Sequence, residues 1–325
     1  MTSKDPPGLL VRLNPAQQQI LDELGSTERP TFRDDLRDHL RHELETALAP
    51  VAQRLTAVSG DDTILYLSKH RLNQVHGCEQ RFVAEEAVPF SWTVASARGT
   101  VVHKAVELLV GRRGNPTPLD LVDDSLARLE ANERSIGPFL AALTEAERAD
   151  LVTSANDVIA GFIDAFPPLR RQWVPVAESK VRAEFCDAAV VLQGAVDLTL
   201  GRARGNEAGK VLIDLKTGRT TPNHVDDLRF YALLETLKLG VPPRLIVTYY
   251  LESGLPRTES VTEDLLWSTA HRVIDGANRA VALLHEKTEP RLVTSPACRW
   301  CPALESCDVG QAYIASTDDL SVSET

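Results

Sequence analysis

The 325-residue chain lacks the long apolar segments and the leader peptide of exported or membrane-embedded proteins. No apolar run approaches the ~20 residues that a membrane-spanning helix needs. The first residues, from Met1 to Gly8, show no signal-peptide pattern. We therefore expect a cytoplasmic protein that makes no contact with a membrane.

The chain also lacks a glycine-rich phosphate-binding loop, which excludes a nucleotide-driven motor. Its net charge of −11 shows no excess of positive charge and argues against a large nucleic-acid surface, because DNA binding needs local positive charge. A narrow basic groove remains possible, since basic residues outnumber acidic ones between Gly201 and Gly240. The acidic excess lies elsewhere in the chain.

Methionine and cysteine are scarce, with one and five residues. The single methionine, together with many arginines and alanines, indicates genome composition rather than function. The rest is ordinary for a globular protein, 43% hydrophobic and 25% charged. A chain of this length has room for one large domain or two small ones.

Two short apolar runs in the middle of the chain each contain an aspartate. L-Q-G-A-V-D-L-T-L-G includes Asp197, and V-L-I-D-L-K-T-G-R includes Asp214; the polar turn between them predicts two adjacent strands. Lys216 follows Asp214 by two residues, so strand alternation places both on one face. Charges among Val, Leu and Ile are costly unless they pair or bind a cation. The residues leave two interpretations open: a site for Mg²⁺ or Mn²⁺, or a buried Asp–Lys ion pair.

The order of G-x-x-D and then D-x-K resembles the PD-(D/E)xK nuclease superfamily. Within it, the chain resembles the RecB-type branch, which includes the AddB nuclease domain and the CRISPR-associated RecB-like exonucleases. The resemblance covers about residues 64–308. It implies an α/β, restriction-endonuclease-like core with a central mixed sheet flanked by helices, a helical insertion and an iron–sulfur-stapled C-terminus. It also implies a deoxyribonuclease, a single-stranded DNA exonuclease in DNA repair or recombination that uses metal-activated water.

One histidine and one glutamate that precede the two aspartates are further candidates for the site. His103 follows Gly99 by four residues on one face of a predicted helix over 97–112, and alone it would be interpreted as a satisfied core histidine. The G-x-x-x-H pattern resembles the first motif of the RecB-type branch, which implies a metal ligand. The strand W-V-P-V-A-E-S-K contains Glu178 where the resemblance places a glutamate. An exposed strand glutamate is the alternative, and Glu184 is a weaker competitor for the role.

The resemblance implies a ligand set for the metal, Mn²⁺ or Mg²⁺. It consists of His103, Asp197, Asp214 and the backbone carbonyl of Leu215, with Glu178 assisting a second ion or the outer shell. A neutral imidazole suits Mn²⁺ better than Mg²⁺. Lys216 would then orient or deprotonate the attacking water.

The helix after the second aspartate is expected to contact DNA. The resembling family carries Q-x-x-x-Y there, and Tyr231 matches the tyrosine. Asp227 occupies the place of the glutamine, and a carboxylate cannot donate a hydrogen bond to a phosphate. Arg229 or His224 is the candidate replacement, and Arg219 is a further candidate for DNA binding.

The C-terminal segment P-A-C-R-W-C-P-A-L-E-S-C places Cys298, Cys301 and Cys307 at C-x₂-C-x₅-C spacing. Clustered cysteines in a cytosolic chain indicate a metal rather than disulfides. Cys78 is the candidate fourth ligand, and Cys186 fits the core of the sheet. This arrangement of one distant N-terminal cysteine and a C-x₂-C-x₅-C segment resembles the [4Fe–4S] site of RecB-type nucleases, and a structural Zn²⁺ site is the alternative.

The predicted organisation has three parts. Residues 1–60 form a helical, mostly solvated appendage, residues 61–310 the nuclease domain, and residues 311–325 a flexible tail. The domain contains an insertion at about 113–170 and the cysteine tail at about 296–308. Leucines recurring every fourth residue predict a helix before Pro50, which we expect to end it.

Without a motor, the chain depends on others for strand opening, so a helicase or another repair protein is the expected partner besides single-stranded DNA. A second function remains open: a non-catalytic iron–sulfur DNA-binding subunit beside a helicase or in CRISPR spacer acquisition. The aspartate at position 227 in place of the family's glutamine and the acidic net charge favour this second function. The intact G-x-x-x-H, G-x-x-D and D-x-K motifs disfavour it.

Overall fold

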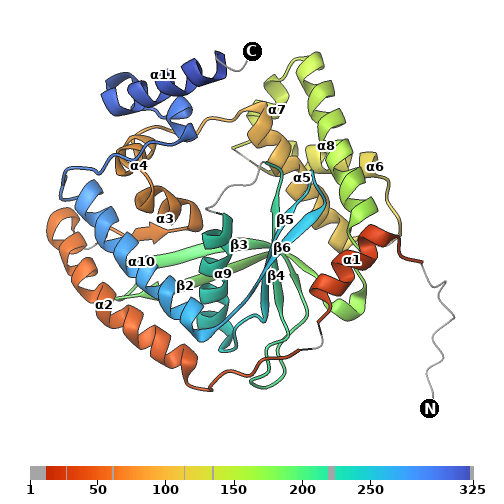
Figure 1. Cartoon of the computed structure of the whole chain (residues 1–325), viewed down its shortest axis with the longest axis horizontal. Coiled ribbons are helices and arrows are strands. Elements are labelled where there is room, and N and C mark those ends of the chain that lie inside the picture. Colours follow the sequence, from red (N-terminus) through yellow and green to blue (C-terminus); the bar gives the residue numbers. More distant parts are fainter. Residues whose placement is uncertain are drawn as a thin grey trace.

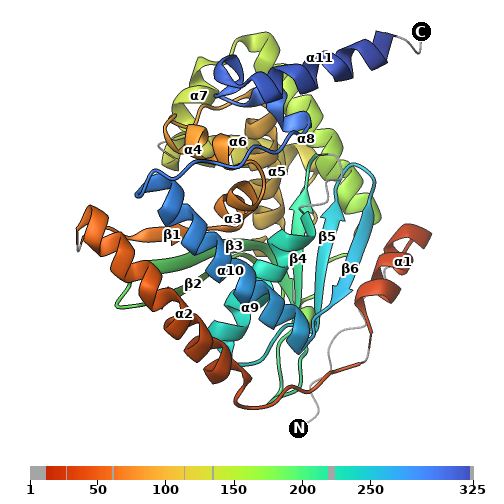
Figure 2. The same ribbon diagram turned by 60° about the vertical axis from the view of Figure 1, so that its left-hand side comes forward.

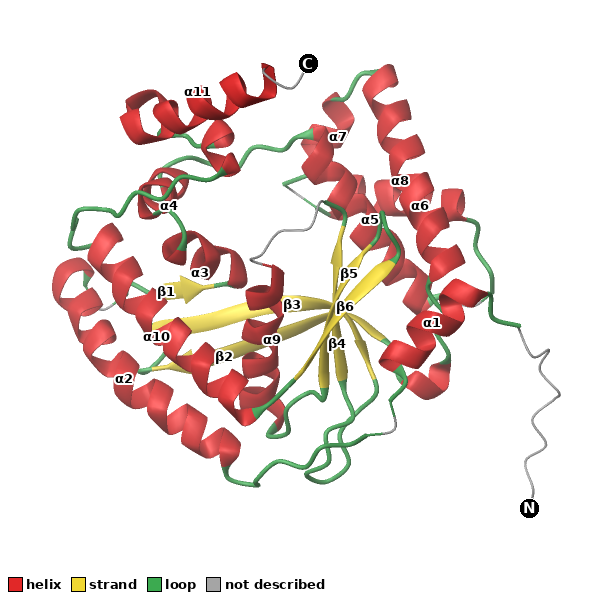
Figure 3. Ribbon diagram, in the orientation of Figure 1, coloured by secondary structure: helices red, strands yellow, loops and turns green. Residues whose placement is uncertain are grey.

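A mixed β-sheet lies at the centre of the molecule and is covered by helices on both faces (Figures 1 and 3). The computed structural model describes residues 12–26, 28–60, 62–112, 114–133, 135–218 and 224–322. The strands of this part are β1 (Leu65–Leu67), β2 (Val176–Phe185), β3 (Val190–Leu200), β4 (Val211–Lys216), β5 (Leu245–Tyr250) and β6 (Leu255–Ser260). The α/β fold with a mixed central sheet, predicted from the sequence, is confirmed.

Strand β3 pairs with three strands. Its antiparallel partner β2 covers one edge over nearly its whole length, from Phe185–Val190 to Val176–Thr199. Strands β1 and β4 must therefore share the other edge. There β1 pairs in parallel with residues 190–192, and β4 pairs antiparallel with residues 198–200.

This sharing leaves a gap on the edge of β3 between residues 192 and 198. Because β1 runs parallel and β4 antiparallel to β3, their carboxyl ends point toward each other across the gap. Lys69 follows the end of β1, and Asp214 and Lys216 lie at the end of β4. Polar residues far apart in sequence are thereby brought to one place.

Four helices cover one face of the sheet and form a continuous core with it (Figures 1 and 2). They are α2 (Leu36–Ser59), α3 (Lys69–His76), α9 (His224–Leu239) and α10 (Glu263–Leu284). Helix α10 is capped by Thr262, whose side chain accepts from the Leu265 amide. Leu212 of β4 packs into this core, so its neighbour at alternate spacing, Asp214, faces the same helices.

The opposite face is covered by α5 (Val94–Gly111) and by the helices of the predicted insertion. The latter are α6 (Pro118–Asn132), α7 (Gly137–Ala142) and α8 (Glu145–Ala165), and α1 (Pro15–Leu24) packs against α8. The alternate residues of β4, among them Ile213 and Leu215, pack here. Helix α5, predicted over 97–112, begins at Val94 after the N-cap Thr93, whose hydroxyl accepts from the Ser96 amide.

The expectation that Pro50 ends the N-terminal helix is wrong. Helix α2 continues through Pro50 to Ser59, and its leucines at 36, 40, 44 and 48 are fully buried. Val51 and Leu55 continue the same apolar stripe beyond the proline. Packing of this stripe against α10 and the sheet outweighs the ~3 kcal/mol that a proline costs inside a helix.

The C-terminal segment returns to the short helix α4 (Glu79–Glu86), as Figure 2 shows. It contains two 3₁₀ turns, Pro296–Trp300 and Leu304–Ser306, followed by α11 (Asp308–Val322). The tail predicted to be flexible from residue 311 is therefore helical as far as Val322. Asp308 in its first turn complements the helix dipole. None of the described helices is long and apolar enough to cross a membrane.

Gly194 of β3 faces the ring of Tyr231 at very close range. A Cβ added there would lie 2.5 Å from the tyrosine Cε1. We expect Gly194→Ala to lower the free energy of unfolding by about 1–3 kcal/mol through overpacking, measured by urea denaturation. Gly161→Ala, in α8 with nothing within 4 Å, is the control and should instead raise it by about 0.5–1 kcal/mol. Equal effects of the two substitutions would contradict the packing argument.

Candidate active site

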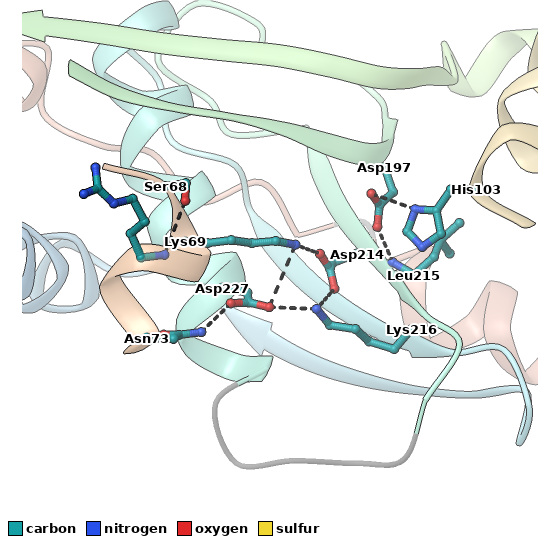
Figure 4. A network of polar contacts seen from close by, with 10 residues as sticks. Ser68, Lys69, Asn73, His103, Asp197, Asp214, Leu215, Lys216 and Asp227 are labelled. Carbon is teal, nitrogen blue, oxygen red and sulfur yellow. Dashed lines mark hydrogen bonds and ion pairs between the residues drawn. The ribbon is translucent and has the colours of Figure 1, made fainter. Parts of the chain in front are cut away.

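Asp214 is the most buried charged residue of the gap, with no exposed surface. Its Oδ1 accepts a hydrogen bond from Lys69 Nζ at 2.6 Å, and its Oδ2 lies 2.8 Å from Lys216 Nζ (Figure 4). The prediction that Asp214 and Lys216 share a face is confirmed. Within the described part of the chain, Oδ2 accepts no hydrogen bond of normal geometry, although Lys216 forms an ion pair with it. A divalent ion bound to this oxygen would have to share it with Lys216.

Asp197 occupies the other side of the gap, where the β3–β4 ladder has ended at Leu198–Ile213. One carboxylate oxygen accepts from the Leu215 amide at 2.6 Å, and the other lies 3.2 Å from His103 Nδ1. The Leu215 amide is thus the group that contacts Asp197, and the predicted ligand role of its carbonyl stays a prediction. His103 projects from α5, so the expected proximity of His103 and Asp197 is observed (Figure 4).

Glu178 joins this pair from β2. One ligand atom each of His103, Glu178 and Asp197 lies within 4.8 Å of the others, an arrangement able to hold a metal ion. In the register of β2 and β3, Glu178 would lie opposite Asp197, but these two residues do not form a β-pair. The backbone of Glu178 has a φ of +50°. A positive φ is unfavourable for a non-glycine residue and is often found at functional sites. Strand β2 is therefore irregular at Glu178, where its carboxylate comes close to that of Asp197.

The electrostatics of the three-residue cluster differ from those of Asp214. Burial disfavours the charged imidazole of His103, but the Asp197 carboxylate outweighs burial and raises the His103 pKa. Burial, followed by the charge of Asp197, raises the pKa of Glu178. Burial opposes ionisation of Asp214, yet Lys69 and Lys216 outweigh it and lower the pKa of that carboxyl group. The cluster therefore carries excess negative charge, whereas Asp214 is compensated.

Asp227, the residue that departs from the family pattern, holds Lys216 in place. Its Oδ2 lies 2.7 Å from Lys216 Nζ and 3.8 Å from Lys69 Nζ, and its Oδ1 accepts from Asn73 Nδ2 at 2.6 Å. Sequence reasoning missed Lys69 and Asn73, because they lie on α3, some 145 residues before Asp214. The unexpected charge of Asp227 was the one signal that a cationic partner existed.

Of the predicted DNA-binding residues, Tyr231 borders the gap. It is buried against Gly194, the ammonium of Lys69 lies 5.0 Å from its ring centroid, and burial raises its pKa to about 12. Arg229 forms a bidentate pair with Glu259, with distances of 2.6 and 3.0 Å. Arg219 falls outside the described residues. The DNA-binding roles of all three remain predictions.

A second potential metal site is formed by cysteines. Cys78, Cys298, Cys301 and Cys307 line one cavity between α4 and the C-terminal segment, whereas Cys186 lies at the far end of β2 beside Glu45. The four residues predicted to act together are therefore brought together. Cys78 precedes the first residue of α4, and Cys307 precedes that of α11. The Gly310 amide donates to Cys307 Sγ at 3.3 Å.

Buried charge fixes the path of the chain at this cavity. Glu79, next to Cys78, accepts two hydrogen bonds from Arg279 of α10 and one from the Arg291 amide at 2.6 Å. The Glu79 amide in turn donates to the Arg291 carbonyl at 3.0 Å. These contacts hold the segment that leads to Cys298 against α4. The position of this segment is thus set by contacts of the polypeptide itself.

The sequence profile of the PD-(D/E)XK nuclease superfamily matches residues 66–308. A solved structure of a protein from Eubacterium rectale named "Putative exonuclease" is 14% identical, with 76% of this chain and 87% of that chain covered and a TM-score of 0.47. The structure of SSO0001 is 14% identical, with 66% and 97% covered and a TM-score of 0.30. No curated protein matches the chain.

Binding of a divalent ion at the cluster should depend on pH. A ligating imidazole must be neutral, and the pKa of His103 is raised above 6.5 by Asp197. Mn²⁺ affinity should therefore rise with pH until that raised pKa is passed. The His103–Asp197 ion pair of the metal-free protein has the opposite dependence, since its stabilisation is present at low pH and is lost as pH rises through the same pKa.

The measurement is Mn²⁺ titration by calorimetry at several pH values, with His103→Gln as the control. The variant should bind Mn²⁺ more weakly and with a flatter pH dependence, because its side chain has no proton to lose. An unchanged pH dependence would show that His103 does not contact the ion.

Proposed function

Because the chain belongs to the PD-(D/E)XK nuclease superfamily, we propose that it is a metal-dependent deoxyribonuclease. The observation that carries the proposal is the convergence of His103, Glu178 and Asp197 with Asp214 and Lys216 at one gap in the sheet. This set joins hard oxygen donors, one imidazole and one ammonium group. Such a combination suits hydrolysis of a phosphodiester by a metal-activated water.

The donor set fits Mn²⁺ or Mg²⁺. His103, Asp197 and Glu178 offer atoms within 4.8 Å of one another, and Asp214 Oδ2 is buried without a hydrogen bond. Carboxylates are the preferred ligands of both ions, and the imidazole favours Mn²⁺. A bound ion would stabilise charge on the phosphate and lower the pKa of a water molecule.

Lys216 is placed to orient the attacking water. Its ammonium group lies 2.8 Å from Asp214 Oδ2 and 2.7 Å from Asp227 Oδ2. Two carboxylates thus hold it at the end of β4 and leave its third proton for a water or a phosphate oxygen. The Leu215 amide fixes Asp197 on the neighbouring strand, so the two sides of the gap keep their spacing.

We further propose single-stranded DNA as the substrate, with cleavage from an end, in DNA repair or recombination. The support is the resemblance to RecB-type nucleases, carried by G-x-x-x-H, G-x-x-D and D-x-K in that order and by the four cysteines. Tyr231, beside Gly194 and Lys69, is the side chain best placed to position the strand. A helicase or another repair protein would supply the opened duplex.

Cleavage of end-labelled single-stranded DNA with Mn²⁺ tests the activity. Lys216→Gln should lower the rate by at least about 100-fold, because it removes a preorganised charge from the reacting phosphate. Lys180→Gln, an exposed lysine of β2, is the matched control and should cleave as the wild type does. Asp214→Ala is a less selective test, since it leaves Asp227 as the one carboxylate within ion-pair distance of both Lys69 and Lys216 among the described residues.

The label also reports the direction of cleavage. Full activity of Lys216→Gln would refute the assignment of the site. A wild-type protein that binds Mn²⁺ and single-stranded DNA but cleaves nothing would instead favour the non-catalytic DNA-binding subunit.

We propose that the four-cysteine cavity holds a [4Fe–4S] cluster. In a tetrahedral Zn²⁺ site with Zn–S of about 2.3 Å, the sulfurs lie about 3.8 Å apart. In the described part of the chain, no three of these sulfurs lie within 4.8 Å of one another. Wider spacing suits a cluster, where each thiolate binds a different iron. Burial raises the pKa of the Cys301 thiol, so loading the site must displace its proton.

Iron analysis and visible absorbance test this proposal. The wild type should contain about four irons per chain and be brown. Cys301→Ser should lose the iron and destabilise the C-terminal segment, whereas Cys186→Ser should retain both colour and iron because that thiol lies outside the cavity. Stoichiometric zinc in place of iron would support the structural zinc site instead.

A further inference from the structure

Lys69 occupies a position that the activity proposed above does not use. It is the first residue of α3, directly after β1, and its ammonium group enters the gap from the side opposite His103 (Figure 4). Its Nζ lies 2.6 Å from Asp214 Oδ1 and 3.8 Å from Asp227 Oδ2. The side chain is 25% exposed, so it can be reached from solvent and can move.

The two lysines and two aspartates of this region balance in charge. Asp214 and Asp227 each contribute one negative charge, and Lys69 and Lys216 each contribute one positive charge. The carboxylate of Asp214 has 1% of its side chain exposed and would be costly if left uncompensated. Lys69 therefore supplies half of the compensation that keeps Asp214 ionised in the absence of a metal.

A divalent ion brought to Asp214 changes this balance. Lys69 occupies Oδ1 at hydrogen-bond distance, and an ion on the same carboxylate would lie within a few ångströms of the ammonium group. Like charges at such range repel strongly where little water screens them. Metal and Lys69 cannot both make their best contact with Asp214.

We propose that Lys69 is a positioning residue that holds Asp214 in the metal-free protein and competes with the catalytic ion for its carboxylate. The proposal rests on the function proposed above. Asp227 Oδ2, 3.8 Å from Lys69 Nζ, is the acceptor to which the displaced ammonium group moves. Asn73 keeps that carboxylate in place by donating to its other oxygen at 2.6 Å. The exchange keeps each charged group paired in both states.

The experiment measures Mn²⁺ affinity by electron paramagnetic resonance of the free ion, without DNA, on the protein with its cysteine-bound metal intact. Lys69→Gln keeps a hydrogen-bond donor for Asp214 but removes the competing charge. It should bind Mn²⁺ more tightly by about tenfold or more, the order expected for removing one charge a few ångströms from a divalent ion. Lys69→Arg keeps the charge and should stay within about twofold of the wild type.

Lys180→Gln removes an exposed lysine from the same sheet and controls for net charge, so its Mn²⁺ affinity should equal that of the wild type. The second readout is the thermal midpoint: Lys69→Gln should melt lower than the wild type in chelator and gain more from Mn²⁺. A variant that folds poorly in chelator is purified with Mn²⁺, and its affinity is then measured by competition with the chelator.

Unchanged or weaker Mn²⁺ affinity in Lys69→Gln, with normal binding by the wild type, would overturn the competition while leaving the nuclease proposal intact. Equal tightening in Lys69→Arg would also overturn it, because the effect would then follow from shape rather than charge. A wild type that binds no Mn²⁺ would instead remove the metal-dependent function itself.

Discussion

The edge of β3 that β1 and β4 share is the constraint on which the candidate site depends. Since β2 fills the other edge, the two strands approach from opposite directions and stop short of each other. A sheet without such a gap would use its backbone groups for pairing and place side chains only above and below. Here the Leu215 amide is left free to bind Asp197, which fixes the spacing between neighbouring strands. The ends of β1 and β4 thus lie on either side of the candidate site.

Charge is distributed unequally on the two sides of this gap. Asp214 lies between two ammonium groups, whereas His103, Glu178 and Asp197 share at most one positive charge among them. Burial makes the second arrangement unfavourable without a cation, as the raised pKa values of His103 and Glu178 indicate. The positive φ of Glu178 adds backbone strain at the same point. The geometry therefore favours an occupant with positive charge beside Asp197.

Short-range pattern predicted much of this architecture. Alternation placed Asp214 and Lys216 on one face, and helical spacing placed His103 on α5. The spacing of three cysteines, with Cys78 as the candidate fourth, grouped the four cysteines that line one cavity. These predictions depend on residues within a few positions of one another or on a family pattern.

The contributions that sequence could not show are all long-range. Lys69 meets Asp214 only because β1 ends at the gap, and no local period indicates that. Asp227 departs from the family pattern, but the sequence does not show its three partners, Asn73 and Lys69 of α3 and Lys216 of β4. Helix α2 passes through Pro50 because its buried stripe continues on both sides of the proline. In each case tertiary packing overrides or completes a local signal.

Helix α3 connects the two potential metal sites. It begins at Lys69 in the active-site gap and ends two residues before Cys78, a length of about 12 Å for eight residues. Gly276 of α10 allows it a close approach, since a Cβ there would lie 2.5 Å from Leu72. A shift of the cysteine end would move Lys69 at the other, and with it the charge balance around Asp214. A metal bound by these cysteines would hold α3 in place, a structural role that needs no electron transfer.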